Sequence, residues 1–315
     1  MRILENTNYN FVGNTKIAYI ITGGLLLLGL ASLLLKGIEP GIDFLGGTEI
    51  VVETDTPVAP AAARGVLASV LGSDPEVKEY GGPNALLIRS TYGGDVDALQ
   101  RQVQQTLAQA FPQANPEIGR IDTVGPRFAD DLKRGAIYAV LGSLLVIFLY
   151  VMLRFHWTYS AGAVLCLAHD VVVTLGVISL LEGIVPFSLQ LDQTLVAAFL
   201  TIVGYSINDT VVVYDRIREF TNLFKSEPFD RVVNRAINST LSRTVITGGT
   251  TLLSLVVLFF FGGETLKGFA FTMIFGILLG TYSSIFIASP VMMALRGWAV
   301  KRGRMKPAAT SPRAS

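Results

Sequence analysis

Six strongly polar side chains interrupt the apolar stretches of this sequence and are the residues best placed to do chemistry. In chain order they are His169, Asp170, Asn208, Asp209, Arg243 and Thr247. An ionised group at the centre of a membrane helix costs at least about 2.5–3.5 kcal/mol on insertion scales. Such groups persist where they are paired or where a function, such as moving protons, requires them. The four ionisable residues are therefore candidate functional residues, and the uncharged Asn208 and Thr247 are candidates for a polar pathway or for helix packing.

Asp209 and Arg243 are the strongest pair of candidates. Asp209 lies six residues before Asp215, so the two residues are about 9 Å apart along a helix. Arg243 starts the next apolar stretch from the same side, and its long side chain can reach a neighbouring helix. Two interpretations are open. Asp209 is a protonatable switch whose affinity for a proton Arg243 adjusts, or the two residues form a static ion pair that fixes helix packing.

The other polar candidates also have two interpretations each. His169 and Asp170 are adjacent, so their side chains point about 100° apart on a helix and do not both face one partner. A polar pathway and a buried helix contact are both open for this pair and for Asn208. The threonines that follow Arg243, with Thr247 among them, either line a hydrated path or make ordinary hydrogen bonds between helices.

The elements that carry these residues are predicted from hydrophobicity. Hydrophobic residues make up 51% of the 315-residue chain and charged residues 16%, a composition that a soluble protein of this length cannot bury. About 20 apolar residues cross the hydrocarbon core of a bilayer. Six stretches meet this requirement: 17–35, 135–153, 159–181, 194–214, 241–261 and 268–295. In the last stretch, Gly276 and Gly280 predict a close helix–helix contact and no chemistry.

Positively charged residues predict which side each link faces. Lysines and arginines gather at Arg154, in 216–235 and after the sixth stretch, whereas the opposite short links contain Lys267 alone. Both termini are therefore predicted to be cytoplasmic. The predicted organisation is a cytoplasmic N-terminus (1–15), a first membrane helix (16–36), an extracytoplasmic domain (37–133) and membrane helices 2–6 (134–295), followed by a tail (296–315).

Segment 37–133 has the pattern of a small α+β domain. Residue patterns predict strands at 48–54, 76–80, 85–90 and 117–124 and helices at 59–71 and 95–110. Asp95 is of a type that caps helix N-termini. The order β-α-β-β-α-β is that of a ferredoxin-like unit.

Two further segments are predicted on the cytoplasmic side. In 216–240, Val232, Val233 and Ile237 fall on one helical face, with Arg231 and Arg235 on another. This amphipathic segment either lies in the membrane surface or packs on the protein itself. The basic tail, 296–315, is rich in Pro, Ala and Ser near its end and is predicted to be disordered.

Several activities are excluded by the composition. The sequence contains no Gly-x-x-x-x-Gly-Lys-Ser/Thr, Gly-x-Ser-x-Gly or His-Glu-x-x-His motif, so we expect no enzyme activity and no cofactor. Energy then comes from a partner or from an ion gradient. One cysteine and two histidines argue against a metal site built on those residues. The net charge of +1 gives no indication of nucleic-acid binding.

Several strings of residues resemble the SecF family of protein-export subunits. They are 41–48 (GIDFLGGT), 124–126 (VGP), 153–157 (LRFHW), 169–171 (HDV), 204–219 (GYSINDTVVVYDRIRE), 240–244 (TLSRT) and 280–286 (GTYSSIF). The resemblance extends in the same order from about Tyr9 to Leu295.

The resemblance implies half of an RND-type transporter, in which six membrane helices carry a ferredoxin-like extracytoplasmic domain in the bacterial plasma (inner) membrane. It implies SecD as a separate partner chain, the SecYEG channel, SecA acting from the cytoplasm, and a translocating polypeptide in a lipid bilayer. In this family an acidic residue of the fourth span and an arginine of the fifth are implicated in proton conduction. These positions are Asp209 and Arg243 here, so H⁺ is the expected coupling ion.

Two other functions stay open. A passive scaffold of the translocase would use Asp209 and Arg243 only for packing. An RND-type exporter of small molecules or lipids would use the same membrane helices, although the small outer domain shows no polar pocket signature to support it.

Overall fold

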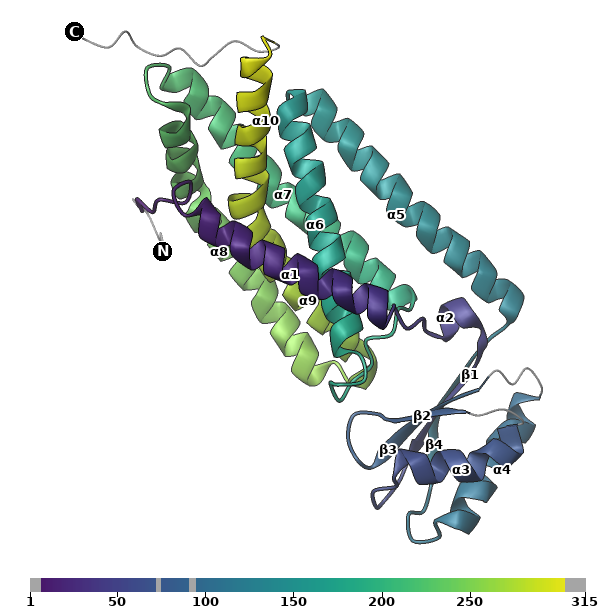
Figure 1. The fold of residues 1–315 in the computed structure, drawn as a ribbon. Helices are drawn as coiled ribbons and strands as arrows, with labels where there is room; N and C mark the ends of the chain where they lie inside the picture. The colour runs from purple at the N-terminus through teal and green to yellow at the C-terminus, as the bar shows by residue number, and fades with distance from the viewer. Residues whose placement is uncertain (1–6, 72–74, 91–94, 304–315) are drawn as a thin grey trace.

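Six long helices form a bundle beside a small α+β domain (Figure 1), in a computed structural model that describes residues 7–71, 75–90 and 95–303. Each of the six is long and apolar enough to cross a membrane. They are α1 (Thr15–Leu35), α5 (Pro126–Arg154), α6 (Trp157–Leu181), α7 (Gln193–Leu223), α8 (Phe229–Phe261) and a composite of α9 (Glu264–Ser283), the π-helix η1 (Ser284–Ala288) and α10 (Ser289–Lys301). Helix α1 begins and α10 ends on the side remote from the domain, which we name the termini side. The opposite side is named the domain side.

The small domain is a four-stranded antiparallel sheet packed against two helices. Its elements and the short helix before it are α2 (Ile42–Leu45), β1 (Gly47–Glu53), α3 (Pro60–Leu71), β2 (Glu76–Glu79), β3 (Ala85–Ser90), α4 (Val96–Ala110) and β4 (Glu117–Val124). Leu67 and Leu99 from the helices are fully buried against Ile50 and Ile88 from the sheet. The strand order is β2-β3-β1-β4 with antiparallel neighbours. This order confirms the predicted ferredoxin-like unit.

Helix boundaries differ from the sequence-based expectation in two places. Helix α5 begins at Pro126, so residues 126–133 belong to a helix rather than to the domain, because proline suits the first turn of a helix. Residues 296–301, expected to begin a disordered tail, form the end of α10 instead. Residues 304–315 of that tail lie outside the described part of the chain.

The amphipathic segment 216–240 is divided between the end of α7 and the start of α8. Val233 and Ile237, on the apolar face of α8, are buried in the same core cluster as Tyr214 of α7. Asn234 and Asn238 donate hydrogen bonds to the backbone oxygen of Tyr9, at 2.8 and 2.9 Å. The apolar face of this segment is therefore covered by the protein itself, the second of the two expected alternatives.

Glycines allow the closest approaches between helices. A Cβ at Gly176 of α6 would lie 2.2 Å from the Cα of Gly29 on α1, so these two backbones touch. A Cβ at Gly280 of α9 would lie 3.0 Å from the Cβ of Ser206 on α7, and Gly276 also faces α7. Gly276 and Gly280 thus let α9 pack tightly on α7, as their spacing predicts.

Polar side chains attach the small domain to the bundle. Arg89 on β3 donates to Gln190 in the link between α6 and α7. Arg120 on β4 donates to the hydroxyl of Thr265 at the start of α9, at 2.7 Å. The domain is therefore bound to the link between α6 and α7 and to the start of α9.

A second set of contacts surrounds Lys78 on β2. Its ammonium group lies 2.5 Å from Glu39, which follows α1, and 3.3 Å from Glu182 at the end of α6. Burial alone would raise the pKa of Glu39, but its hydrogen bonds and the charge of Lys78 lower it to about 2. Burial opposes the charge on Lys78 as well, yet hydrogen bonds with Glu39 and Glu76 leave its pKa raised. This contact therefore stays ionised at neutral pH.

Candidate functional site

Asp170 is the centre of a buried polar cluster inside the bundle. It lies on α6 with 1% of its surface exposed. Its Oδ2 accepts hydrogen bonds from Ser206 Oγ on α7 and Ser283 Oγ on α9, each at 2.7 Å. Its Oδ1 lies 3.0 Å from Nδ1 of His169. Three helices are therefore joined by one carboxylate.

Helix packing brings the two serines to this carboxylate. Gly280 has no side chain to separate α9 from α7 at Ser206. Ser283 lies three residues after Gly280, and residues three apart share one face of a helix. Both serines are buried, at 1% and 0% exposure. The small-residue pattern in α9 therefore positions the hydroxyl groups as well as the helices.

The helix that carries Ser283 changes its winding directly after this residue. The π-helix η1 follows, and the Ser289 hydroxyl donates to the backbone oxygen of Ser284 at 3.2 Å. Tyr214 on α7 donates to the backbone oxygen of Ala288 at 2.8 Å. Single π turns often occur at functional sites. Here the π turn changes the hydrogen-bond spacing of the sixth membrane helix directly after Ser283, which bonds to Asp170.

Asp209 is a second buried carboxylate, on α7. It is 4% exposed, and its Oδ2 has no hydrogen-bond partner within the described residues. The same holds, in that part of the chain, for Tyr205 Oη, Thr210 Oγ1 and His169 Nε2. Most buried polar atoms in proteins have a partner. Tyr205 lies one helical turn before Asp209 on α7, so this unpaired phenol and carboxylate oxygen are a candidate path for protons or water.

The expected contact between Asp209 and Arg243 is absent as an ion pair. No ion pair within 4 Å involves either residue in the described ranges, and the side chain of Arg243 is exposed on α8. Its charge still acts on the Asp209 carboxylate. Helical rise places both residues at a similar depth, but it does not fix the direction of their side chains. The static ion pair considered from the sequence is not formed in this structure.

The remaining candidates lie outside the Asp170 cluster. Asn208 is exposed on α7. The backbone oxygen of Thr247 accepts hydrogen bonds from the hydroxyls of Thr250 and Thr251, both at 3.0 Å. The hydroxyls of Thr250 and Thr251 therefore bond within their own helix. Both interpretations of Thr247 stay predictions.

Sequence reasoning missed the roles of Ser206 and Ser283. In the sequence these two residues stand only within the strings 204–219 and 280–286. One signal was available, since Ser206 lies three residues before Asp209 and thus near it on one helical face. For Ser283, the signal is the close approach that Gly280 permits three residues earlier. The adjacent His169 and Asp170, expected to diverge, bond to each other instead.

This arrangement can take up and release a proton. An ionised carboxylate only accepts hydrogen bonds, whereas a protonated one also donates. Protonation of Asp170 would therefore change the hydrogen bonds between α6, α7 and α9. No group of three or more metal-binding side chains was found among the described residues.

Comparisons with known proteins agree with the resemblance in the sequence. The model of "Protein export membrane protein SecD/SecF, C-terminal" matches residues 102–298, and that of the "SecD/SecF GG Motif" matches residues 31–58. The protein translocase subunit SecF of Rhodothermus marinus is 57% identical over 97% of this chain and 99% of its own length. The protein translocase subunit SecF of Escherichia coli O157:H7 is 36% identical over 91% of this chain and 88% of its own length.

A solved structure has the same fold. The crystal structure of SecDF, a translocon-associated membrane protein from Thermus thermophilus, superposes with a TM-score of 0.82 at 35% identity. The match covers 94% of this chain and 40% of the SecDF chain. On these grounds, the chain belongs to the SecF group of the SecD/SecF family of protein-export membrane proteins.

Proposed function

We propose that this protein assists polypeptide export by coupling the proton gradient to movements of its helices, together with SecD and beside the SecYEG channel. SecA supplies ATP-driven force from the cytoplasm, and this protein acts on the emerging polypeptide on the other side. The observation that supports this role best is the pair of carboxyl groups, Asp170 and Asp209, buried between apolar helices.

Burial makes these carboxyl groups sensitive to protonation. An ionised carboxylate in an apolar interior is costly unless hydrogen bonds or a cation compensate. Asp170 has two serine hydroxyls and His169 as compensation, whereas one oxygen of Asp209 has no partner among the described residues. A proton entering this region therefore has two acceptors with different surroundings.

A proton on Asp170 would weaken the contact between helices. Ser206 and Ser283 both donate to the same oxygen, Oδ2. If that oxygen became a hydroxyl, it would donate to one of the serines, whose own hydrogen would have to turn to another acceptor. The bond from the other serine would then be made to a neutral oxygen and would be weaker. The π turn that follows Ser283 provides a point at which the last membrane helix can adjust. In this way a proton is converted into a helix displacement.

SecD is the expected partner of the exposed apolar surfaces. The SecDF chain contains more than the part that this chain matches. Leu35, Leu153 and Phe261 on three membrane helices are at least 85% exposed in the isolated chain. Lipid and a second helical subunit can both cover such surfaces.

We further propose that both termini are cytoplasmic in a bacterial plasma membrane. Arg154, Arg218 and Arg235 lie on the termini side, near the ends of α5, α7 and α8. Positive residues in short links mark the cytoplasmic side. The small domain would then lie outside the cytoplasm, where exported chains emerge.

Export into inverted membrane vesicles that contain this chain, its SecD partner and SecYEG tests the proposal. Asp209→Asn should assemble normally and lose the part of export that an uncoupler also removes. Arg243→Ala should reduce that part as well, because its charge acts on Asp209. Asp215→Asn is the matched control, since the side chain of Asp215 is 42% exposed, lies nearer the end of the same helix and pairs with Arg154. If Asp209→Asn assembles and retains uncoupler-sensitive export, the protein is a passive scaffold instead.

A further inference from the structure

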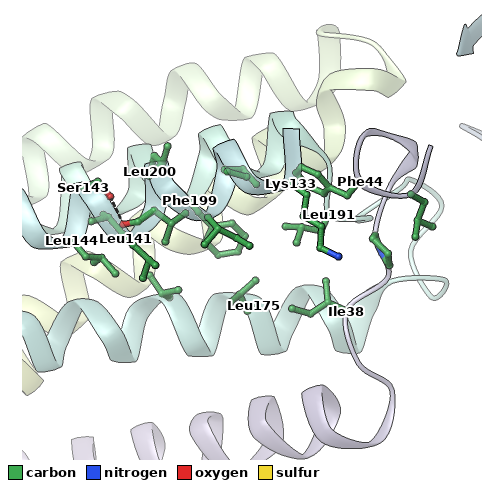
Figure 2. A pocket seen from close by; sticks show the side chains of 18 residues that line it. Ile38, Phe44, Lys133, Leu141, Ser143, Leu144, Leu175, Leu191, Phe199 and Leu200 are labelled. Carbon is green, nitrogen blue, oxygen red and sulfur yellow. Dashed lines mark hydrogen bonds between the residues drawn. The ribbon is translucent and has the colours of Figure 1, made fainter. Parts of the chain in front are cut away.

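An apolar groove lies between α5 and the neighbouring helices α6 and α7 on the domain side (Figure 2). It has a volume of about 400 Å³, within the usual range of small-molecule sites. Its walls include Leu141 of α5, Leu175 of α6 and Phe199 of α7, and the segment after α1 contributes Ile38 and Phe44. Apolar side chains from four segments of the chain therefore line the groove.

Two polar side chains contribute to this lining, Lys133 and Ser143. The Ser143 hydroxyl donates to the backbone oxygen of Val140 at 2.8 Å, so its hydrogen is already used. Lys133 is exposed and makes no ion pair within the described residues, although Asp130 lies one turn earlier on α5. The groove thus presents one cation that is available to a ligand.

The depth of the groove corresponds to one leaflet of a bilayer. Its lining on α5 extends from Lys133 to Leu144, which is about 16 Å at the rise of an α-helix. The hydrocarbon core is about 30 Å thick. Lys133 lies two residues before the apolar stretch 135–153, where headgroups are expected. The groove therefore extends from headgroup level to about the middle of the membrane.

The helix α5 leaves this space because it is attached near its two ends. Ala129, near the small domain, is 2% exposed, and Val151, near the termini side, is fully buried. These two are the buried residues of α5, and in its most apolar 18-residue part 6% of the residues are buried within the chain. A partner helix crossing the membrane would need a groove of full depth, whereas an acyl chain needs only half of it.

We propose that this groove binds one acyl chain of a phospholipid from the leaflet on the domain side, with the lipid phosphate on Lys133. The groove lining includes Val171, next to Asp170, and Val203, three residues before Ser206. The lipid would therefore support the two helices that carry the buried carboxylates. This proposal does not depend on the export function and concerns a bound lipid rather than a transported one.

Native mass spectrometry of the full chain, released from bilayers of phosphatidylglycerol and phosphatidylethanolamine, tests this site by counting retained phospholipids. We expect one retained phospholipid per chain. Lys133→Gln should weaken its retention about five-fold, since a lysine near anionic lipid contributes about 1 kcal/mol. Arg134→Gln is the matched control, because Arg134 is exposed on the same helix and does not line the groove. Equal retention by Lys133→Gln and Arg134→Gln would contradict the phosphate contact.

A filling substitution tests the acyl-chain site without changing charge. Val140→Trp should occupy the groove and abolish retention of the phospholipid, whereas Leu145→Trp should not, because Leu145 is 57% exposed on α5 outside the groove. A phosphatidylglycerol with a photoreactive acyl chain should label α5 and α7 in the wild type and in Leu145→Trp, but not in Val140→Trp. Labelling that is unchanged in Val140→Trp, or cross-linking of the Leu141→Cys variant to a partner helix, would overturn the proposal.

Discussion

Asp170 and Asp209 differ in the groups that surround their carboxyl oxygens. Asp170 is held by hydroxyls from α7 and α9 and by the neighbouring His169. Asp209 retains an oxygen without a partner within the described part of the chain. Hydrogen bonds to a charged group contribute about 1.5–3 kcal/mol each. The hydroxyls therefore hold the Asp170 carboxyl group between three helices, and their loss should lower the stability of the protein.

Removing the two serine hydroxyls tests whether they act as one unit. Ser206→Ala and Ser283→Ala should each destabilise the protein by about 1.5–3 kcal/mol, the value for a bond to a charged group. The free energy of unfolding that the double variant loses should differ from the sum of the losses in the two single variants, because both serines bond to the same oxygen. Unfolding in a detergent solution measures all three, with Ser254→Ala as the control, since Ser254 bonds within its own helix. Strict additivity would show that the serines act separately.

Asp192 predicts a pH dependence outside the membrane helices. It precedes α7 and accepts a hydrogen bond from the Leu195 backbone at 2.6 Å. Burial raises its pKa to about 6, with Asp43 and Glu49 adding to the effect. Because the folded protein favours the protonated form, stability should fall as the pH rises from about 4 to about 6.

Asp192→Asn should remove this dependence and keep the helix cap, which asparagine also provides. Above pH 7 the variant should be more stable than the wild type. The difference should be at most about 3 kcal/mol, because the pKa of Asp192 is raised by about two units and each unit corresponds to about 1.4 kcal/mol. Near pH 4 the variant and the wild type should be equally stable. Melting temperatures across this pH range provide the measurement, with the exposed Asp97→Asn as control. A wild type that is as stable as the variant at pH 8 would contradict the argument.

At the scale of elements, glycine contacts decide how closely the helices approach. The backbones of α1 and α6 touch at Gly29 and Gly176, where no side chain can yield. Gly176→Ala should therefore separate these helices and destabilise the bundle by about 1–3 kcal/mol, as overpacking does. Gly24→Ala on α1 should have little effect on packing, because nothing lies within 4 Å of the added Cβ. Thermal unfolding in detergent distinguishes the two variants, and equal melting temperatures would contradict the contact.

Elements were more predictable from the sequence than contacts between them. The strand at 85–90 and the helix start at Asp95 match the structure because turns and caps depend on neighbouring residues. The bonds from Ser206 and Ser283 to Asp170 depend on the rotation and crossing of three helices. The Asp209–Arg243 contact was not formed for the same reason. Hydrophobicity sets the depth of a residue but not the direction in which it points.

At the scale of the whole molecule, the small domain is attached to the links between membrane helices. Arg89 contacts Gln190, and backbone hydrogen bonds at 2.8 Å join Gly41 and Glu39 to Leu191. A movement of α6 or α7 would therefore reach the domain directly. The sequence did not predict this attachment, because its residues come from segments far apart in the chain.

Arg89→Gln should loosen the attachment while leaving the domain folded. Arg89 donates one hydrogen bond to this link, at Gln190. Loss of this charged bond, which contributes about 1.5–3 kcal/mol, should raise amide exchange in the α6–α7 link about ten-fold or more. Arg101→Gln on α4 is a matched control, because Arg101 is exposed and makes no ion pair within the described residues. Hydrogen exchange followed by mass spectrometry measures both. Unchanged exchange at Leu189 and Leu191 in Arg89→Gln would contradict a tight attachment.

The central claim is that buried carboxyl groups in the bundle gain and lose a proton. Infrared difference spectra of the protein and its SecD partner in bilayers, recorded as one side is acidified, detect this through the C=O band of a protonated carboxyl group. We predict that Asp170→Asn and Asp209→Asn each change this band, whereas Asp215→Asn leaves it as in the wild type. Spectra of Asp170→Asn and Asp209→Asn that are identical to the wild type would contradict the account and leave the two residues with a structural role.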